Sequence, residues 1–286
     1  MKCDCHIHIF MDGQNYRNAH DRHLEKVDEA CIRSHLEEYK KRGITYVRDG
    51  GDHLRVSLRA KELAAGYGIT YRSPVFAIYR KGCYGSIVGK AFEDMKEYAA
   101  LVKEVRRLGG DFIKIMTTGI MDFQCAGKIT GERLDFSQVR EMVHIAHEEG
   151  FSVMAHTNGA DGVREAALAG VDSLEHGNYQ DEDSLQALKD NGVVWVPTLV
   201  TVRNLQGKGR FPEEEIKKIL HTQDCTVRQA AALGVKMASG TDAGAWMVFH
   251  GKALEQEYEA FEKILGDRKT AEKYLEQGNE EIRNKF

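Results

Sequence analysis

The first residues of the chain carry two histidines whose types and spacing suit a metal ion. They stand in the run Asp4-Cys5-His6-Ile7-His8. Because successive side chains of a β-strand point to opposite faces, Asp4, His6 and His8 would share one face of a strand formed here. Neutral imidazole is a common protein ligand for zinc and similar ions. Two ligands do not hold a metal, so the remaining ligands must come from elsewhere in the chain.

Four more polar residues lie in or just after runs that have the composition of buried strands. Lys114 interrupts an apolar run, and His156 directly follows another. His176 and Asp242 each stand just beyond a later run of this kind. Imidazoles and a carboxylate together suit Zn²⁺ or a similar divalent ion, whereas a lysine fits beside them only if its ammonium is neutralised or converted.

The elements that must position these residues alternate between short β-rich runs and amphipathic helical runs. We predict eight strands, at residues 4–8, 44–48, 69–78, 112–116, 151–155, 171–174, 193–196 and 235–238. We predict helices at residues 28–41, 54–65, 91–108, 135–149, 163–169, 183–190 and 212–233. Strands that alternate with helices form parallel βαβ units with right-handed crossovers. The sequence therefore predicts an α/β fold, a (β/α)₈ TIM-like barrel, as a single domain over residues 1–286.

The barrel explains why the polar residues are scattered along the chain. In a parallel barrel the carboxyl ends of all strands meet at one mouth, where the βα loops build the active sites of this fold. The two histidines of the first strand and the four later polar residues are therefore expected to form one cluster. Residues 9–27, after the first strand, are expected to form a long polar loop and are a candidate lid.

Composition disfavours several other classes of protein. With a net charge of −4 and both signs interspersed, the chain offers no basic surface for nucleic acid. No apolar run approaches the length of a membrane helix, and no signal-peptide core follows the N-terminus, so we expect a cytoplasmic protein without a membrane partner. The six cysteines lack the spacing of a small disulfide-rich domain, which suits a reducing compartment.

The chain is similar to the amidohydrolase superfamily, and within it to the imidazolonepropionase-like and prolidase-like metal-dependent hydrolases. The similarity covers nearly the whole chain in the family's order. It rests on five segments: Asp4-Cys5-His6-Ile7-His8, Gly43-Ile44-Thr45-Tyr46-Val47-Arg48-Asp49, Asp111-Phe112-Ile113-Lys114-Ile115-Met116, Ala169-Gly170-Val171-Asp172-Ser173-Leu174-Glu175-His176-Gly177 and Gly240-Thr241-Asp242-Ala243-Gly244.

One feature departs from the family's usual layout. Many relatives carry a β-sandwich built from residues before and after the barrel, whereas this chain starts at the first predicted barrel strand. We therefore expect a barrel without the flanking sandwich. A homo-oligomer would be one way to supply the missing cover.

The resemblance implies a binuclear metal site with two divalent ions, zinc being favoured. It assigns the ligands as follows: His6, His8 and Asp242 to the buried ion, His156 and His176 to the second ion, and Lys114, carboxylated by CO₂, as a bridge between them. A carbamate turns a cationic amine into a bidentate anionic ligand. This conversion explains how a lysine could lie at the end of a buried strand between two cations.

The resemblance also implies an enzyme that hydrolyses an amide-like C–N bond, in an N-acyl amino acid, a dipeptide or a cyclic amide. A hydroxide that bridges the two metals would attack, and Asp242 would act as the base. Lactone, ester and phosphotriester hydrolysis use the same parts and stay open. A mononuclear aminohydrolase is disfavoured, because such relatives place a glutamate shortly after the strand-five histidine, where this chain has residues 157–160 without one. A non-catalytic, metal-bound binding protein also stays open.

The sequence gives weaker indications of what the site recognises. The loop after the third strand carries Arg80 and Tyr84, and the segment after the first strand carries Arg17. A planar guanidinium favours carboxylates with bidentate geometry, so a small-molecule substrate that carries a carboxylate is expected. His250, in the loop after Asp242, is expected either to line the pocket or to cap the last helix.

Overall fold

The structure is a computed structural model that describes all residues from 1 to 286. All paired strands run parallel, in two sheets with the orders β1-β2-β3 and β5-β4-β6-β7-β8-β9. The strands are β1 (Lys2–Ile7), β2 (Ile44–Asp49), β3 (Thr70–Arg72), β4 (Ala77–Arg80), β5 (Gly89–Phe92), β6 (Ile113–Met116), β7 (Val153–Thr157), β8 (Ser173–His176) and β9 (Val194–Val196).

Two seams join these sheets into a closed barrel. At one seam, the predicted third strand 69–78 passes from the first sheet to the second as β3 and β4. Pro74 lacks an N–H that could pair with a neighbouring strand, and Val75 adopts a positive φ of 70°. These two residues therefore interrupt the strand between β3 and β4. At the other seam, the predicted eighth strand, residues 235–238, is reduced to a parallel β-bridge from Met237 to Trp195, and residues 236–239 bond to the strands on either side. Trp195 N donates to Lys236 O at 2.9 Å, and Cys5 N donates to Ser239 O at 2.9 Å.

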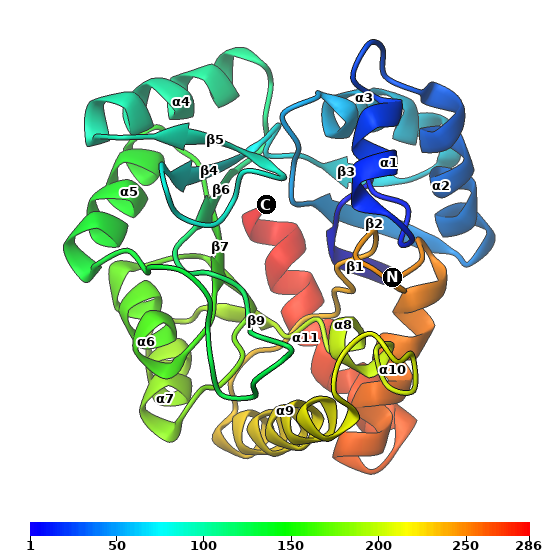
Figure 1. The fold of residues 1–286 in the computed structure, drawn as a ribbon, viewed down its shortest axis with the longest axis vertical. Helices are drawn as coiled ribbons and strands as arrows, with labels where there is room; N and C mark the ends of the chain where they lie inside the picture. Colours follow the sequence, from blue (N-terminus) through cyan, green and yellow to red (C-terminus); the bar gives the residue numbers. More distant parts are fainter.

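Helices surround the ring of strands, as Figure 1 shows, and the predicted (β/α)₈ barrel is confirmed. They are α1 (Tyr16–Arg22), α2 (Glu29–Lys41), α3 (Val56–Ala64), α4 (Met95–Arg107), α5 (Phe136–Glu148), α6 (Ala160–Ala169), α7 (Glu182–Asp190), α8 (Val200–Arg203), α9 (Glu213–Leu233), α10 (Lys252–Leu265) and α11 (Arg268–Lys285), with a short 3₁₀ helix at Ala65–Tyr67. None of these helices combines the length and the apolar character that crossing a membrane requires.

The helix boundaries follow from local capping. The Asp28 side chain accepts from the backbone N–H groups at the start of α2, and Asp135 forms a capping box with Gln138 at the start of α5. Both helices lie where the sequence predicts them. The expected loop 9–27, however, contains the helix α1, which the side chain of Asn15 caps by accepting from two backbone N–H groups.

A second difference lies after the third barrel strand. The segment between β4 and α4 contains β5, which pairs with β4 outside the ring of eight strands. The helix predicted over 91–108 therefore begins later, at Met95, where the side chain of Asp94 caps it. β5 was missed because the sequence run that forms it is short and follows a glycine-rich loop.

The last helix, α11, closes the amino-terminal end of the barrel. In Figure 1 it runs to the centre of the ring, where the C-terminus lies. Ile282 and Phe286 belong to a buried cluster with residues of the barrel strands, such as Cys5, and with Phe112 just before β6. The Phe286 and Phe112 rings meet edge to face, with centroids 5.2 Å apart. The barrel floor is therefore covered by the chain's own helix.

Candidate active site

Four imidazoles gather at the carboxyl ends of the strands. His6 lies in β1 and His8 just after it, whereas His156 lies in β7 and His176 ends β8. The centroid of the His6 ring lies 5.4 Å from that of His8 and 5.0 Å from that of His176. The centroids of the His156 and His176 rings are 4.6 Å apart. Side chains from three separate strands therefore share one small volume.

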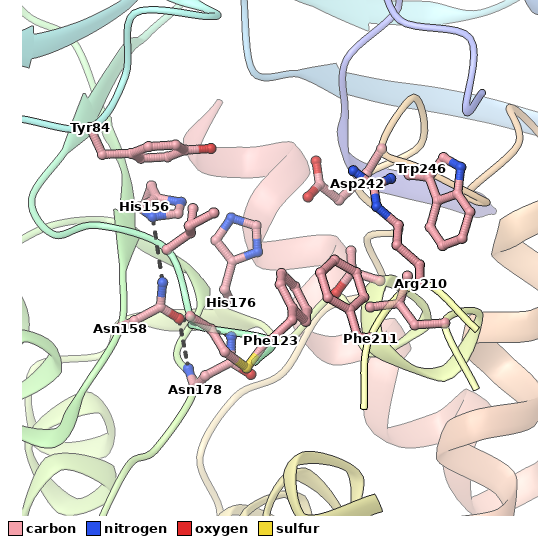
Figure 2. A pocket seen from close by; sticks show the side chains of 15 residues that line it. Tyr84, Phe123, His156, Asn158, His176, Asn178, Arg210, Phe211, Asp242 and Trp246 are labelled. Carbon is pink, nitrogen blue, oxygen red and sulfur yellow. Dashed lines mark hydrogen bonds between the residues drawn. The ribbon is translucent and has the colours of Figure 1, made fainter. Parts of the chain in front are cut away.

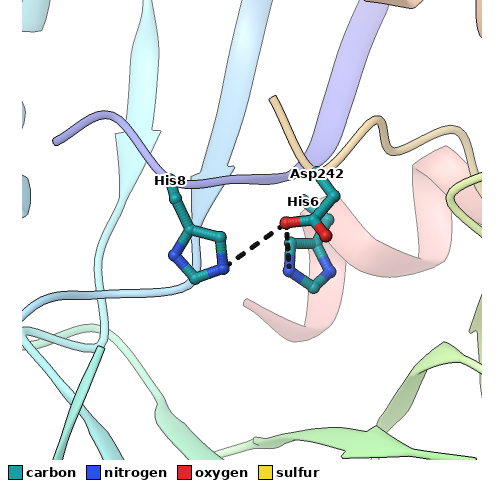
Figure 3. Close-up of side chains that lie close together, drawn as sticks. All are labelled: His6, His8 and Asp242. Atoms are coloured by element: carbon teal, nitrogen blue, oxygen red, sulfur yellow. Dashed lines mark ion pairs between the residues drawn. The ribbon is translucent and has the colours of Figure 1, made fainter. Parts of the chain in front are cut away.

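Asp242 completes one side of this cluster. Its Oδ1 lies 3.6 Å from His6 Nε2 and 3.5 Å from His8 Nε2 (Figure 3). One donor atom from each of these three residues lies within 4.8 Å of the others, so they could hold a metal ion. The backbone of Asp242 adopts a positive φ of 58°, and its N–H donates to His6 O at 2.7 Å. This strained conformation aims the carboxylate at the two imidazoles.

Asp4 does not join the cluster. Its carboxylate accepts hydrogen bonds from the N–H and the hydroxyl of Thr241, at 2.9 and 2.8 Å. The register of β1 against β2 shifts between Asp4 and Ile7, so the simple alternation expected from the sequence does not run through this strand. Asp4 instead fixes the turn that carries Asp242.

Burial keeps the clustered imidazoles neutral. Desolvation, reinforced by the positive charge of Lys114, lowers the pKa of His8 and of His156 to about 3. The pKa values of His6 and His176 are also well below the usual range, again chiefly because of burial. A neutral imidazole has a lone pair free for a metal, so these side chains are in the protonation state that a ligand needs.

Lys114 lies in β6 beside the imidazoles, and its side chain is 1% exposed. The buried Nζ has no hydrogen-bond partner. Desolvation lowers the pKa of Lys114 to about 8, so much more of this amine is neutral near neutral pH than for an exposed lysine. An unpaired ammonium is costly in such a place, so this position fits a lysine whose charge is neutralised or converted.

Three of the four imidazoles have one ring nitrogen engaged by a protein oxygen. His6 Nδ1 contacts Glu175 Oε2 at 2.7 Å, His176 Nδ1 contacts Thr198 Oγ1 at 2.8 Å, and His156 Nε2 contacts the Gly119 carbonyl oxygen at 3.1 Å. Each such contact orients the ring and leaves the other nitrogen available. His6 Nε2 is buried without a hydrogen-bond partner. This arrangement is typical of histidines that bind metals, with the outer contact fixing the tautomer.

Glu175 is held in turn by an arginine inside the barrel. Arg48 Nη2 donates to Glu175 Oε1 at 2.8 Å, and Ser173 Oγ lies 2.7 Å from the same oxygen. Both charged side chains are 0% exposed. The sequence analysis singled out neither residue, although each is a charged residue in a strand that is otherwise suited to burial. A charged residue inside an apolar strand was therefore the sequence signal that could have identified both residues.

A cavity of two lobes opens above the cluster. The larger lobe, of about 600 Å³, reaches His6, His8 and Lys114, and its outer wall includes the segment 14–17. The smaller lobe, of about 230 Å³, extends toward α8 and is shown in Figure 2. The two lobes share a wall made of these residues: Tyr84, His156, His176, Arg210, Asp242, Ala245 and Trp246. Three of the metal-ligand candidates, His156, His176 and Asp242, therefore lie where the lobes meet, and the other three line the larger lobe alone.

The predicted substrate residues divide into two groups. Arg17 lines the larger lobe, and Tyr84 lines both lobes with its ring 5.1 Å from that of His156. Arg80, the last residue of β4, lines neither lobe. His250 is buried behind the cavity wall, where it contacts the Tyr39 hydroxyl at 2.9 Å and the Met11 carbonyl oxygen at 2.8 Å.

Four cavity residues were missed by the sequence analysis. Arg210 and Phe211 lie just before α9, Phe123 lies in the loop after β6, and Trp246 follows Asp242. All four stand in loops that follow barrel strands, which is the place where this fold carries its specificity residues. An arginine or a large aromatic residue in such a loop was the sequence signal that could have identified them as cavity residues.

A family model described as the amidohydrolase family matches residues 3–277 of the chain. An uncharacterized protein of Mycobacterium tuberculosis is 29% identical over 174 residues, which make up 57% of this chain and 45% of that protein. Ochratoxinase of Aspergillus niger is 25% identical over 197 residues, 65% of this chain and 38% of the enzyme. The matched segment thus spans less than half the length of these curated relatives.

A solved structure resembles the chain over nearly its whole length. A Xaa-Pro dipeptidase with bound methionine in its active site superposes with a TM-score of 0.76 at 26% sequence identity. The match covers 99% of this chain and 75% of that chain.

Proposed function

Because the chain belongs to the amidohydrolase family, we propose that it is a binuclear metal-dependent hydrolase that cleaves an amide-like C–N bond. Water is added across the bond, which releases a carboxylic acid and an amine. The bond lies in an N-acyl amino acid, a dipeptide or a cyclic amide. The likeness to a Xaa-Pro dipeptidase supports a substrate of this kind.

In this proposal, His6, His8 and Asp242 would hold one divalent ion, with zinc favoured. His156 and His176 would hold the second. Support comes from the closeness of the donor atoms of the first three residues and from the contact between the rings of the last two. Neutral imidazoles with one nitrogen free and a nearby carboxylate form a donor set that suits zinc or a similar ion.

Lys114 is proposed to carry a carbamate, which would supply an anionic ligand to both ions. The neutral amine attacks CO₂, a C–N bond forms, and the proton leaves, so that an anionic ligand replaces a cation. The buried and unpartnered Nζ of Lys114 supports this step, as does the lowering of the Lys114 pKa to about 8 by burial. Without such a conversion the ammonium would repel both metal ions.

The metal ions, when bound, supply an acidified water and polarise the carbonyl oxygen of the substrate. The residues of the chain do the rest. Asp242 accepts a proton from the attacking water and returns it to the leaving nitrogen. Burial raises the pKa of the Asp242 carboxyl to about 7 when no metal is bound. Tyr84 and Arg17, which line the cavity, are proposed substrate contacts.

The observation that carries the proposal is the buried Lys114 amine, unpartnered and surrounded by imidazoles at one barrel mouth. Protein purified without chelator after growth with zinc or manganese should contain about two divalent ions per chain by elemental analysis. It should also hydrolyse N-acyl amino acids or dipeptides. A metal content near zero would overturn the binuclear site, and two ions without turnover on any amide would overturn the hydrolase.

A pair of lysine variants sharpens this test. Lys114→Ala should lose metal and activity together, and short carboxylic acids should restore part of both by taking the place of the carbamate. Lys103→Ala, at an exposed position of α4, is the matched control and should leave both unchanged. An unmodified Lys114 amine in a metal-loaded crystal would contradict the carbamate.

A further inference from the structure

Two histidines outside the cluster at the barrel mouth meet through their ring nitrogens. His20 lies in α1, and His53 lies in the turn between β2 and α3. His20 Nε2 is 3.3 Å from His53 Nε2, and the ring centroids are 5.4 Å apart with an angle of 50° between the planes. Neither residue lines either lobe of the cavity. The pair is therefore a separate contact between α1 and the barrel.

The spacing of these two nitrogens suits a shared metal ion. Zinc binds imidazole at about 2.0 to 2.1 Å in a tetrahedral arrangement, so two imidazoles on one ion hold their nitrogens about 3.3 Å apart. The observed separation is 3.3 Å. A hydrogen bond between the rings would fit the same spacing, with a proton on one of the two nitrogens. The pair can therefore hold either a proton or an ion.

The other nitrogen of each ring allows Nε2 to act as a ligand. His20 Nδ1 lies 3.1 Å from Asp21 Oδ1, which favours the proton at Nδ1 and the lone pair at Nε2. His53 Nδ1 is buried without a hydrogen-bond partner, so no contact fixes the tautomer of this ring. Burial, together with the charges of His20 and Lys90, lowers the pKa of His53 and keeps it neutral near neutral pH. Both rings can therefore present a lone pair to one ion.

The helix α1 lies within the segment 9–27, the candidate lid, and carries part of the cavity wall. Residues 14–17, at its start, line the larger lobe, whereas His20 lies near its other end. The side chains of α1 make two hydrogen bonds beyond the segment 9–27. Arg22 donates to Cys31 Sγ of α2 at 3.2 Å, and His20 contacts His53. An ion between these two histidines would therefore fasten the cavity wall to the barrel.

We propose that His20 and His53 form a second metal site, for one exchangeable zinc ion, that fastens α1 over the larger lobe. Water would complete the coordination, because no third histidine, cysteine or carboxylate donor joins the pair. With two protein ligands the ion binds more weakly than those at the mouth, so metal-free buffer removes it first. Filling the site restrains the opening of the cavity, so excess zinc slows turnover. The effect on turnover rests on the proposed hydrolase function, whereas the metal site does not.

Limited proteolysis tests the site without any need for turnover. Trypsin can cut at Arg17, Arg22 and Lys26, which are exposed in or next to α1, once this segment opens. In the metal-loaded protein, free zinc should slow this cleavage about tenfold at ten times the Kd of the site, because opening releases the ion. His20→Gln and His53→Gln should each abolish the effect. If zinc leaves the wild-type cleavage rate unchanged, or protects both variants equally well, the site is overturned.

Two controls separate this site from other zinc ligands. His221→Gln, exposed on α9 with its Nε2 3.7 Å from Cys225 Sγ, removes a histidine from another pair that can bind zinc. This variant should keep the full protection of α1. Lys114→Ala, which should hold no ions at the mouth, should keep it as well. Loss of the protection in Lys114→Ala would assign it to the mouth and overturn the second site.

Turnover tests the consequence for the cavity. Excess zinc should lower kcat/KM of the wild type by a factor similar to the slowing of cleavage, because both need α1 to open. His20→Gln should be little affected. Equal inhibition of the two proteins would overturn the closure of the cavity by α1. If zinc protects α1 in a wild type that hydrolyses no amide, the proposed function fails and the metal site stands.

Discussion

Asp242 combines two roles that one substitution can separate. As a ligand it needs an oxygen that faces His6 and His8, and as a base it needs a carboxylate that can take a proton. Asp242→Asn keeps an amide oxygen but cannot accept the proton. We expect the variant to keep most of its metal and to lose about 100-fold or more in kcat.

Elemental analysis measures the metal content of this variant, and turnover of one substrate measures its kcat. Asp161→Asn, exposed in α6, is the matched control and should change neither. Parallel losses of metal and rate would assign Asp242 to metal binding alone. Equal retention of both would remove it from the site chemistry.

Glu175 fixes the tautomer of His6. Its carboxylate accepts the Nδ1 proton, so that Nε2 carries the free lone pair. In Glu175→Gln the amide NH₂ can face Nδ1, which would move the ring proton to Nε2 and block the ligand atom. We expect metal affinity to fall by about 10-fold to 100-fold, measured by competition with a chelator.

The control for this substitution is Glu182→Gln, which is exposed at the start of α7. Circular dichroism of both variants shows whether the fold survives, because Arg48 depends on Glu175 for its only ion pair. A folded Glu175→Gln protein with unchanged metal affinity would contradict the positioning role.

At the residue scale, sequence reasoning located the candidate ligands but not their supports. Histidines and a lysine at strand ends are conspicuous, since apolar runs surround them. Arg48 and Glu175 are also charged residues within strands, but their pairing joins positions 127 residues apart. The alternation of side chains along a strand indicates which residues are buried, but not which buried charges contact each other. This ion pair could therefore be identified only from the three-dimensional structure.

At the element scale, the contact between α11 and the eighth strand depends on a glycine. A Cβ added to Gly278 would lie 2.1 Å from the Met237 carbonyl oxygen, a backbone atom that cannot turn away. Alanine normally stabilises a helix interior relative to glycine by about 0.5 to 1 kcal/mol. Here we expect Gly278→Ala to lower the free energy of unfolding by about 2 kcal/mol or more, because the helix must shift.

Urea denaturation measures this change, and Gly66→Ala provides the comparison. Gly66 lies in the exposed 3₁₀ helix, and a Cβ there would meet nothing within 4 Å. Its substitution should be neutral or slightly stabilising. If Gly278→Ala behaves in the same way, α11 is not held closely against the strand.

Most elements could be predicted because their patterns are local. The caps of α2 and α5 and the apolar runs of β6 and β7 need no distant partner. The exceptions have tertiary causes. β5 is a strand through its pairing with β4, and α11 finds its place through the barrel floor that it covers. An amphipathic pattern predicts that a helix packs, but not on which surface.

At the scale of the whole molecule, the barrel floor and the candidate metal site are connected through the interior. The guanidinium of Arg48 lies 4.3 Å from the centroid of the Phe286 ring, at the end of α11. The same guanidinium holds Glu175, which orients His6. A continuous column of buried side chains therefore runs from the last helix to the mouth, and packing at the floor supports geometry at the site.

This connection predicts that metal binding and global stability are linked. An ion that binds the folded state alone stabilises it by about 2.7 kcal/mol when its free concentration is a hundredfold above its Kd. For a chain of this length, each kcal/mol raises Tm by roughly 2 to 4 °C. Removing the ions with a chelator should therefore lower Tm by about 5 °C or more for each site, and adding zinc should restore it.

Two histidine variants assign this shift to the barrel mouth. His156→Ala should lose part of the Tm increase on addition of zinc, because one proposed ligand is gone. His144→Ala, exposed on α5, should keep all of it. Because His156 reaches Asn158 and Gly119 but none of the floor residues, its loss removes the ion without loosening α11. A Tm that does not respond to chelator or zinc in the wild type would mean that the mouth binds no structurally coupled metal.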